Sequence, residues 1–356
     1  MSAYFQFATE SDGDGILKIM EGDAVKGDIN LLYTRRPDPV ASFFMESGRS
    51  VIGVFKNGKE AVGTIACIPR EMYINSEAHR VCYVTNMKRA HDYEGLINWI
   101  EAFEKMYDPV DSEVFFCSVV KENTDVIKML TKKRRKLPVA VIMEPYRTYM
   151  INPSARIKNP CPKLFFRRAG GGDEREILDF LKTHGSGKNF FPVIDMLDGE
   201  RNPAVSDFYM LSDGERTVAV GALWDRSLCK QYIVKSYSRK IAVLRCLNGL
   251  LSFLGYIRIP KAGSSASFAF LSFFMAENDN TDYYRTFLYH IRKEAAERYD
   301  MFVLGTTEYN KKREVLDKVR AITFDTLLCE VKMSDFKNAR EIEFSCSGLE
   351  VECALL

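Results

Sequence analysis

The chain has 356 residues, of which 46% are hydrophobic, 12% aromatic and 28% charged, a composition typical of a globular protein with more than one compact core. Lys and Arg total 50 against 48 Asp and Glu, so the formal net charge of +2 provides no overall field for a nucleic-acid backbone. The most apolar stretch, Ala266 to Ala276, is far shorter than the roughly 20 residues of a spanning helix. Met1 to Asp12 lacks the basic and apolar regions of a signal peptide. We therefore expect a soluble, cytoplasmic protein that binds neither nucleic acid nor membrane.

The cysteines and histidines do not indicate metal or disulfide chemistry. Nine cysteines are an odd number, and most lie in apolar runs, as Cys117 does behind Phe115 and Phe116. We interpret them as reduced core residues. The chain has no Cys-x-x-Cys pair, and its four histidines show no ligand spacing. We expect no metal.

The segment 152–163 contains three of the 12 prolines between two apolar regions, a composition typical of a linker. We predict one domain at residues 1–151 and another at 164–356. In chain order, the first half is predicted to contain strand 4–9, a helix after Gly15, hairpin strands 50–56 and 60–68 around Asn57-Gly58, strand 80–87, loop 88–95, helix 96–107, strand 113–120, helix 123–130 and strand 139–143.

The second half shows a similar order, which indicates an internal duplication. Its predicted elements are strand 164–169, a turn at 170–172, a helix from Asp173, hairpin strands 208–211 and 217–224, strand 266–275, helix 284–295, strand 301–305, helix 310–319 and strand 324–332. An inserted apolar helix at 239–254 is either buried core or an interface, between the halves or in a homodimer. Alternating apolar residues at 349–355 predict an edge strand.

This order of elements resembles that of the GNAT superfamily of acyl-CoA-dependent N-acyltransferases, and each half resembles one copy. The resemblance implies an α/β (α+β) class with two tandem GNAT-like domains. Each domain would be a mixed, mostly antiparallel sheet flanked by helices, with a V-shaped opening between two parallel strands. It also implies transfer of an acyl group, which we expect to be acetyl, from acyl-CoA to an amine of a small molecule or a protein.

In that family, a loop reading Val-x-Pro-x-x-Arg-x-x-Gly-x-Gly wraps the CoA pyrophosphate with backbone N–H groups, next to a helix N-terminus. Here Val84 and Arg89 fit the pattern, whereas Asn86 replaces the proline and Asp92 and Glu94 replace the glycines. The family also contacts its cofactor through an asparagine after the fifth strand. The resemblance therefore implies a cofactor-binding set of Val84, Asn86, Lys88, Arg89, Ala90, Asp92, Tyr93, Gly95 and Asn123.

The tyrosine that protonates the departing thiolate in the family is absent, because Leu130 stands at that position. Tyr83 and Tyr93 are alternative proton donors, and His91 and Glu122 are candidate bases for the amine. Each also has a simpler interpretation, as a packed tyrosine or a solvated surface side chain.

The second half carries three carboxylates in the corresponding loop, Glu277, Asp279 and Asp282, and no basic residue. They would repel a diphosphate, so we expect this copy to hold no CoA. Asn310 corresponds to Asn123 of the first half. The alternative to an enzyme is a non-catalytic GNAT-like binding or scaffold protein that has lost the cofactor loop.

Two further segments carry charge. The basic run 132–136 is either a solvated turn, a contact for a CoA phosphate, or a site for an acidic or nucleic-acid partner. Tyr33, Arg35 and Arg36 either bind an acidic or aromatic acceptor or belong to an ordinary loop.

Overall fold

The computed structural model describes residues 3–22, 29–237, 263, 267–333, 336 and 342–356. In the first half, the elements are β1 (Tyr4–Phe7), α1 (Gly13–Gly22), β2 (Ile29–Thr34), α2 (Pro39–Glu46), β3 (Val51–Asn57), β4 (Glu60–Ile74), β5 (Glu77–Arg89), α3 (Trp99–Val110), β6 (Val114–Val120), α4 (Thr124–Thr131) and β7 (Val139–Ile151). The predicted order is confirmed. β4, β5 and β7 are longer than predicted, and β2 is an additional strand.

The second half contains β8 (Phe165–Arg168), α5 (Glu174–Gly185), β9 (Phe208–Ser212), β10 (Thr217–Trp224), β11 (Gln231–Tyr237), β12 (Phe268–Ala276), α8 (Thr281–Ala296), β13 (Met301–Thr307), α9 (Lys312–Leu316) and β14 (Ala321–Lys332). Short 3-10 turns lie at Glu10–Asp12, Gly171–Asp173, Val205–Asp207, Glu277–Asp279 and Cys353–Leu355. The predicted helix at 239–254 lies outside the described residues.

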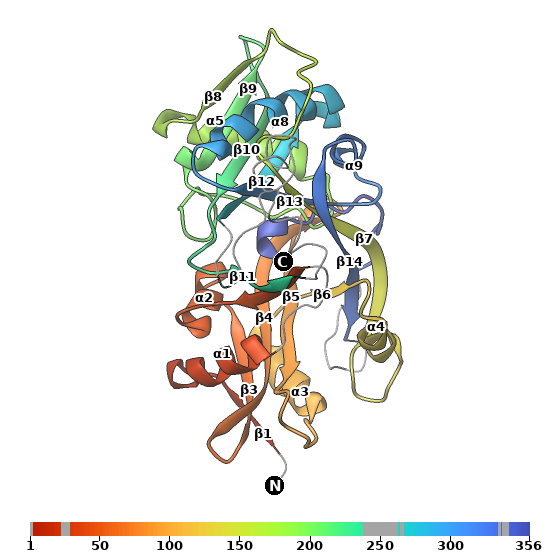
Figure 1. Ribbon diagram of the computed structural model, residues 1–356. Helices are drawn as coiled ribbons and strands as arrows, with labels where there is room; N and C mark the ends of the chain where they lie inside the picture. Colours follow the sequence, from red (N-terminus) through yellow and green to blue (C-terminus); the bar gives the residue numbers. More distant parts are fainter. Residues whose placement is uncertain (1–2, 23–28, 238–262, 264–266, 334–335, 337–341) are drawn as a thin grey trace.

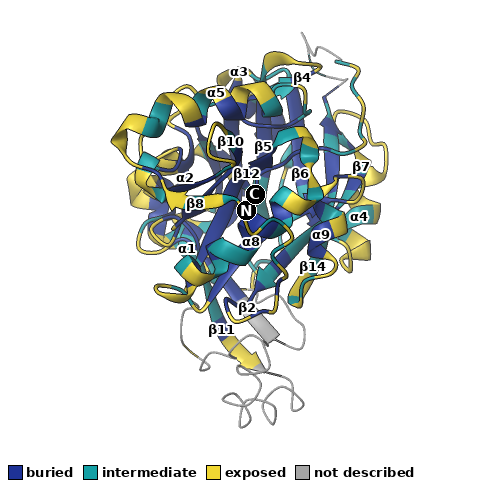
Figure 2. Ribbon diagram, turned by 90° about the horizontal axis from the view of Figure 1, so that it is seen from above, coloured by how far each residue is buried: buried dark blue, intermediate teal, exposed yellow. Residues whose placement is uncertain are grey.

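Twelve strands form one continuous sheet in the order β1-β3-β4-β5-β6-β14-β7-β13-β12-β10-β9-β8. Helices cover both faces of this sheet in both halves (Figure 1). Seen from above, the strands are largely buried and the outward faces of the helices are exposed (Figure 2). The expected architecture of mixed, mostly antiparallel sheets flanked by helices is therefore confirmed, with the sheets of the two halves joined into one.

Each half repeats the same local geometry next to a short parallel pair of strands. β5 and β6 pair in parallel only from Val81 to Tyr83, and β12 and β13 only from Phe268 to Phe270. Because each of these strands continues beyond its last paired residue, an opening follows. A β-bulge lies at the opening in both halves, with Asn86 (φ +52°) on β5 and Phe273 (φ +50°) on β12.

The halves are joined by an exchange of their last strands. β7 of the first half pairs with β13 of the second, and β14 of the second half pairs with β6 of the first. The two exchanged strands also pair with each other, antiparallel, from Ala321 opposite Ile151 to Lys332 opposite Val139. Arg147 on β7 and Asp325 on β14 form a two-point ion pair across this seam, at 2.6 and 2.8 Å. Each half is thus completed by a strand from the other.

Local sequence explains several element boundaries. Gly58 adopts a positive φ of +63° in the Asn57-Gly58 turn between β3 and β4, as the hairpin signal predicts. Asn123 accepts a hydrogen bond from Val126 N at 3.3 Å and so caps α4. Asp38 caps α2 in the same way.

Two of the predicted elements differ in the structure. The helix expected from Leu96 begins at Trp99, and Leu96 is 86% exposed, because β5 continues through Lys88 and Arg89 after its bulge and displaces the loop. The segment 349–355 is not an edge strand. It lies buried between the halves, and the chain ends near the centre of the molecule (Figure 1).

The described part of the chain contains no helix long and apolar enough to cross a membrane, and no group of three or more metal-ligating side chains. The eight described cysteines form no disulfide bond.

The strand exchange predicts that the halves stay together when the linker is cut. Pro162 and Lys163 are exposed, so a protease site inserted between them is accessible. After cleavage, we expect the two fragments to co-elute in size-exclusion chromatography under native conditions and to separate in urea, because β7 and β14 remain paired. Separate elution without denaturant would contradict the exchange.

Candidate functional site

The opening in the first half is bordered by polar groups. Tyr83 on β5 and Ser118 on β6 share a hydrogen bond of 2.7 Å between their hydroxyl groups, just where the parallel pairing ends. Burial raises the pKa of the Tyr83 hydroxyl. At the adjacent bulge, Asn86 Nδ2 is buried and has no hydrogen-bond partner among the described residues. Such an orphaned donor is typical of a surface that a ligand completes.

The loop after β5 is folded tightly onto itself. Ala90 N donates to Val62 O at 2.9 Å, and Tyr93 N donates to Ala90 O at 3.2 Å. A Cβ at Gly95 would lie 2.3 Å from Cζ and Oη of Tyr93, so a larger residue here would displace the Tyr93 ring. Tyr93 OH is buried and lacks a partner within the described chain. The predicted loop residues therefore present two orphaned polar atoms, Tyr93 OH and Asn86 Nδ2.

The charged residues of this region point in different directions. Lys88 Nζ donates to Met20 O of α1 at 3.1 Å, and Asp92 lies 3.9 Å from Lys18 Nζ. Arg89, His91 and Glu94 are exposed.

The N-terminus of α3 follows this loop. Its N-cap residue, Asn98, makes no capping hydrogen bond to the described residues. The first-turn N–H groups of α3 therefore keep the capacity to bind an anion.

The remaining predicted site residues have other surroundings. Val84 is buried in the core opposite Cys67 of β4, so it can contribute only backbone groups to a ligand. Asn123 uses its side-chain oxygen to cap α4. Glu122 is exposed at the end of β6.

In the second half, the corresponding helix N-terminus is already capped. Asn280 accepts hydrogen bonds from Asp282 N at 2.9 Å and Tyr283 N at 3.3 Å. The loop carboxylates are also engaged: Glu277 pairs with Arg216, Asp279 with Lys188, and Asp282 with Arg285.

The opening of the second half is filled by the end of the chain itself. Phe273 N, at the bulge of β12, donates to the carboxyl group of Glu352 at 2.9 Å. Glu350 accepts from Asn310 Nδ2 at 2.7 Å and pairs with Lys312. Burial raises the pKa of Glu352 to about 7. Burial alone would raise the pKa of Glu350 as well, but the charges of Lys312 and Lys188 lower it overall.

Sequence reasoning did not find these tail contacts. Glu350 and Glu352 alternate with apolar residues, a pattern that also fits an exposed strand. Their partners Lys312 and Phe273 are distant in the chain. Ser118 was likewise missed, because it lies inside an apolar run. The resemblance between Asn123 and Asn310 was a signal for the duplication but gave no indication that Asn310 binds the tail.

No known family profile matches the sequence, and no curated protein matches it. Solved structures do match. A probable N-acyltransferase from Enterococcus faecalis aligns over 95% of this chain and 75% of its own, with a TM-score of 0.52 and 8% identity. A GCN5-related N-acetyltransferase from Kribbella flavida aligns over 95% and 74%, with a TM-score of 0.51 and 10% identity. N-myristoyltransferase of Saccharomyces cerevisiae, with bound myristoyl-CoA, aligns over 98% and 84%, with a TM-score of 0.59 and 8% identity. The chain therefore has the tandem GNAT fold.

The buried carboxyl group of Glu352 predicts a specific pH dependence. Its pKa is about 7 in the folded chain against an ordinary value of 4.5, so between these values the folded state holds a proton that the unfolded state has lost. The resulting stabilisation is complete below the ordinary pKa and is lost as pH rises through 7. Glu352→Gln cannot ionise but keeps an acceptor for Phe273 N–H. From about pH 5 to about pH 8, wild type should lose on the order of 2–3 kcal/mol of unfolding free energy that the variant keeps.

Urea unfolding at the two pH values measures this difference. Glu308→Gln, at an exposed position, is the matched control and should follow wild type. Equal pH dependence in wild type and Glu352→Gln would show that the tail carboxyl group is not buried at the β12 bulge.

Proposed function

We propose that the protein is an acyl-CoA-dependent N-acyltransferase that binds its acyl donor in the first half. One observation carries this proposal. Both halves have the same bulge beside a parallel opening, but in the second half the bulge N–H of Phe273 is bonded to Glu352 of the chain's own tail. This occupation of the second opening supports a donor site in the first half.

The groups around this opening fit a CoA thioester. Asn86 Nδ2 and Tyr93 OH are buried polar atoms without partners in the described chain, and the uncapped N-terminus of α3 suits a pyrophosphate. We propose that Lys88 to Gly95 hold the pyrophosphate, with Arg89 offsetting part of the repulsion from Asp92 and Glu94.

Acyl-CoA supplies an activated thioester carbonyl, and the residues of the chain position it. We propose that backbone groups from Val84 to Asn86 orient this carbonyl for attack by the amine nitrogen. A C–N bond then forms and the C–S bond breaks. Tyr83, at the mouth of the opening, donates its proton to the sulfur, and a carboxylate or water accepts the proton that the amine loses.

The donor and acceptor are proposed at the level of chemical class. The acceptor is an amine of a small molecule or a protein, and acetyl is the first donor to test. Myristoyl-CoA is the long-chain comparison, since the solved structures that share this fold include an N-myristoyltransferase with that ligand bound.

Donor binding should raise the melting temperature of the wild-type chain. At about 100 times the dissociation constant, a ligand adds about 2.7 kcal/mol to the unfolding free energy. Arg89→Glu places a third carboxylate beside Asp92 and Glu94, so we expect it to abolish most of the shift. Arg175→Glu changes the same charge at a position on α5 whose side chain is 95% exposed, and should leave the shift intact.

Thermal unfolding with acetyl-CoA and with myristoyl-CoA is the measurement. The absence of a shift with either donor would contradict the proposal and favour the non-catalytic alternative.

A second prediction concerns proton transfer. Tyr83→Phe keeps the packed ring but removes the hydroxyl at the opening, so kcat should fall by about 10²-fold while KM for acyl-CoA stays unchanged. Tyr209→Phe, at a buried position on β9, should leave kcat intact. Steady-state assays of CoA release test this. Unchanged kcat in Tyr83→Phe would exclude this hydroxyl as the acid.

A further inference from the structure

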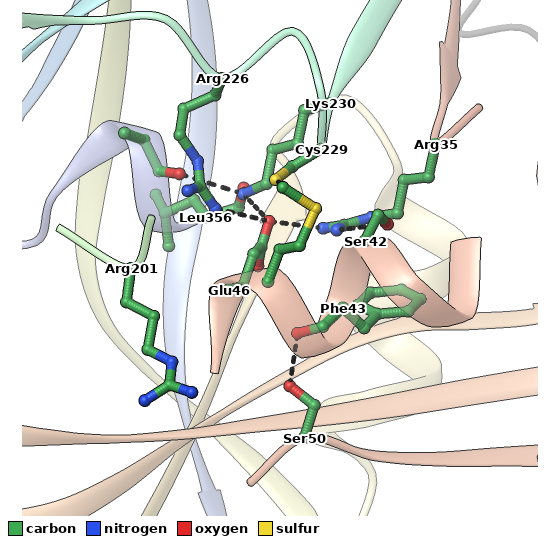
Figure 3. A network of polar contacts seen from close by, with 12 residues as sticks. Arg35, Ser42, Phe43, Glu46, Ser50, Arg201, Arg226, Cys229, Lys230 and Leu356 are labelled. Atoms are coloured by element: carbon green, nitrogen blue, oxygen red, sulfur yellow. Dashed lines mark hydrogen bonds and ion pairs between the residues drawn. The ribbon is translucent and has the colours of Figure 1, made fainter. Parts of the chain in front are cut away.

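A cluster of buried charges lies where the two halves meet. Arg35 follows β2, Glu46 ends α2, and Arg226 and Lys230 lie between β10 and β11. The pairing of β2 with β11, with Thr34 opposite Gln231, brings the first and last of these segments together. All four charged residues are at most 3% exposed. Figure 3 shows their side chains converging.

The carboxylate of Glu46 is shared by all three cations. Its Oε1 lies 3.0 Å from Arg35 Nη2, 3.0 Å from Lys230 Nζ and 3.8 Å from Arg226 Nη2. Lys230 Nζ also donates to Leu356 O at 2.6 Å and Ala354 O at 3.2 Å. The oxygen Oε2 of Glu46 makes no hydrogen bond to the described residues.

The cations keep unused donors. Nε of Arg35 and both Nε and Nη2 of Arg226 are buried without a hydrogen-bond partner in the described chain. Aromatic rings hold both guanidinium groups: Arg35 lies 4.0 Å from the centroid of Phe43, and Arg226 lies 4.3 Å from that of Trp224. The stacked guanidinium of Arg226 therefore presents two neighbouring N–H groups, Nε and Nη2, and such a pair binds a carboxylate at two points.

The charges in this cluster do not balance. Among the described side chains of this cluster, three cations face one buried carboxylate, an excess of two positive charges. In a region shielded from water, such an excess is strongly unfavourable without a counterion. The positive charges of this cluster shift the pKa values of neighbouring groups. Burial alone would raise the pKa of Glu46, but the three cations lower it to about 2. Burial and then the charge of Arg226 lower the pKa of Arg70 to about 10.

We propose that Arg226, Lys230 and Arg35 form a binding site for a second carboxylate beside Glu46. Its source is an acidic group on the acceptor, a reading that rests on the proposed function.

The test compares the melting temperature of the full chain in sodium acetate and in sodium chloride at equal ionic strength, without acyl-CoA. If the site takes a carboxylate from outside, acetate should raise the melting temperature of wild type above that in chloride by at least about 2 °C. Arg226→Met should show no such difference. Arg49→Met, at an exposed position, is the matched control and should respond like wild type.

Should Arg226→Met fail to fold, Lys230→Met replaces it, and the comparison of the two salts on wild type needs neither variant.

The proposal is overturned if acetate and chloride act equally on wild type. It is also overturned if Arg226→Met is more stable than wild type in both salts, because removing an uncompensated cation then relieves repulsion. None of these measurements involves acyl-CoA, so their failure is distinguishable from failure of the proposed acyltransferase function.

Discussion

The exchange of β7 and β14 is the constraint on which the rest of the structure depends. Neither half can complete its sheet alone, because the strand beside β6 comes from the second half and the strand beside β13 comes from the first. This arrangement fixes the two openings relative to one another. It also brings the end of the chain, which follows β14, back into the space between the halves.

The position of the tail distinguishes two otherwise similar openings. In the second half, Glu352 binds the bulge N–H and Glu350 binds Asn310 and Lys312, so the chain's own carboxylates occupy the donors. In the first half, the uncapped N-terminus of α3 and the buried atoms of Asn86 and Tyr93 have no such partners among the described residues. Duplication followed by filling of one opening is the physical basis for the single donor site that we propose.

The order of elements was predictable because it depends on local periodicity and turn chemistry, as the Asn57-Gly58 hairpin shows. The strand exchange was not predictable, since the alternation of side chains in β7 is compatible with a partner strand from either half. The tail was predicted as an edge strand because alternation normally marks one exposed face. Here both faces are buried, as Glu350 meets Lys312, a partner that no local pattern reveals.

For the candidate site, the sequence directed attention to the segment Val84 to Gly95, whose role in cofactor binding stays a prediction. Arg35 was singled out for its charge. Its cluster with Glu46, Arg226 and Lys230 arises only from the pairing of β2 with β11 across the halves. A single sequence contains no pattern that connects residues so far apart in the chain.

The central claim is that only the first half binds the acyl donor. Hydrogen exchange of the full chain, with and without saturating acetyl-CoA, tests it most directly. We predict slower exchange in peptides covering residues 84–99, at the bulge, the loop and the start of α3, and no change at residues 273–282. Protection at residues 273–282 with the first half unchanged would contradict the account.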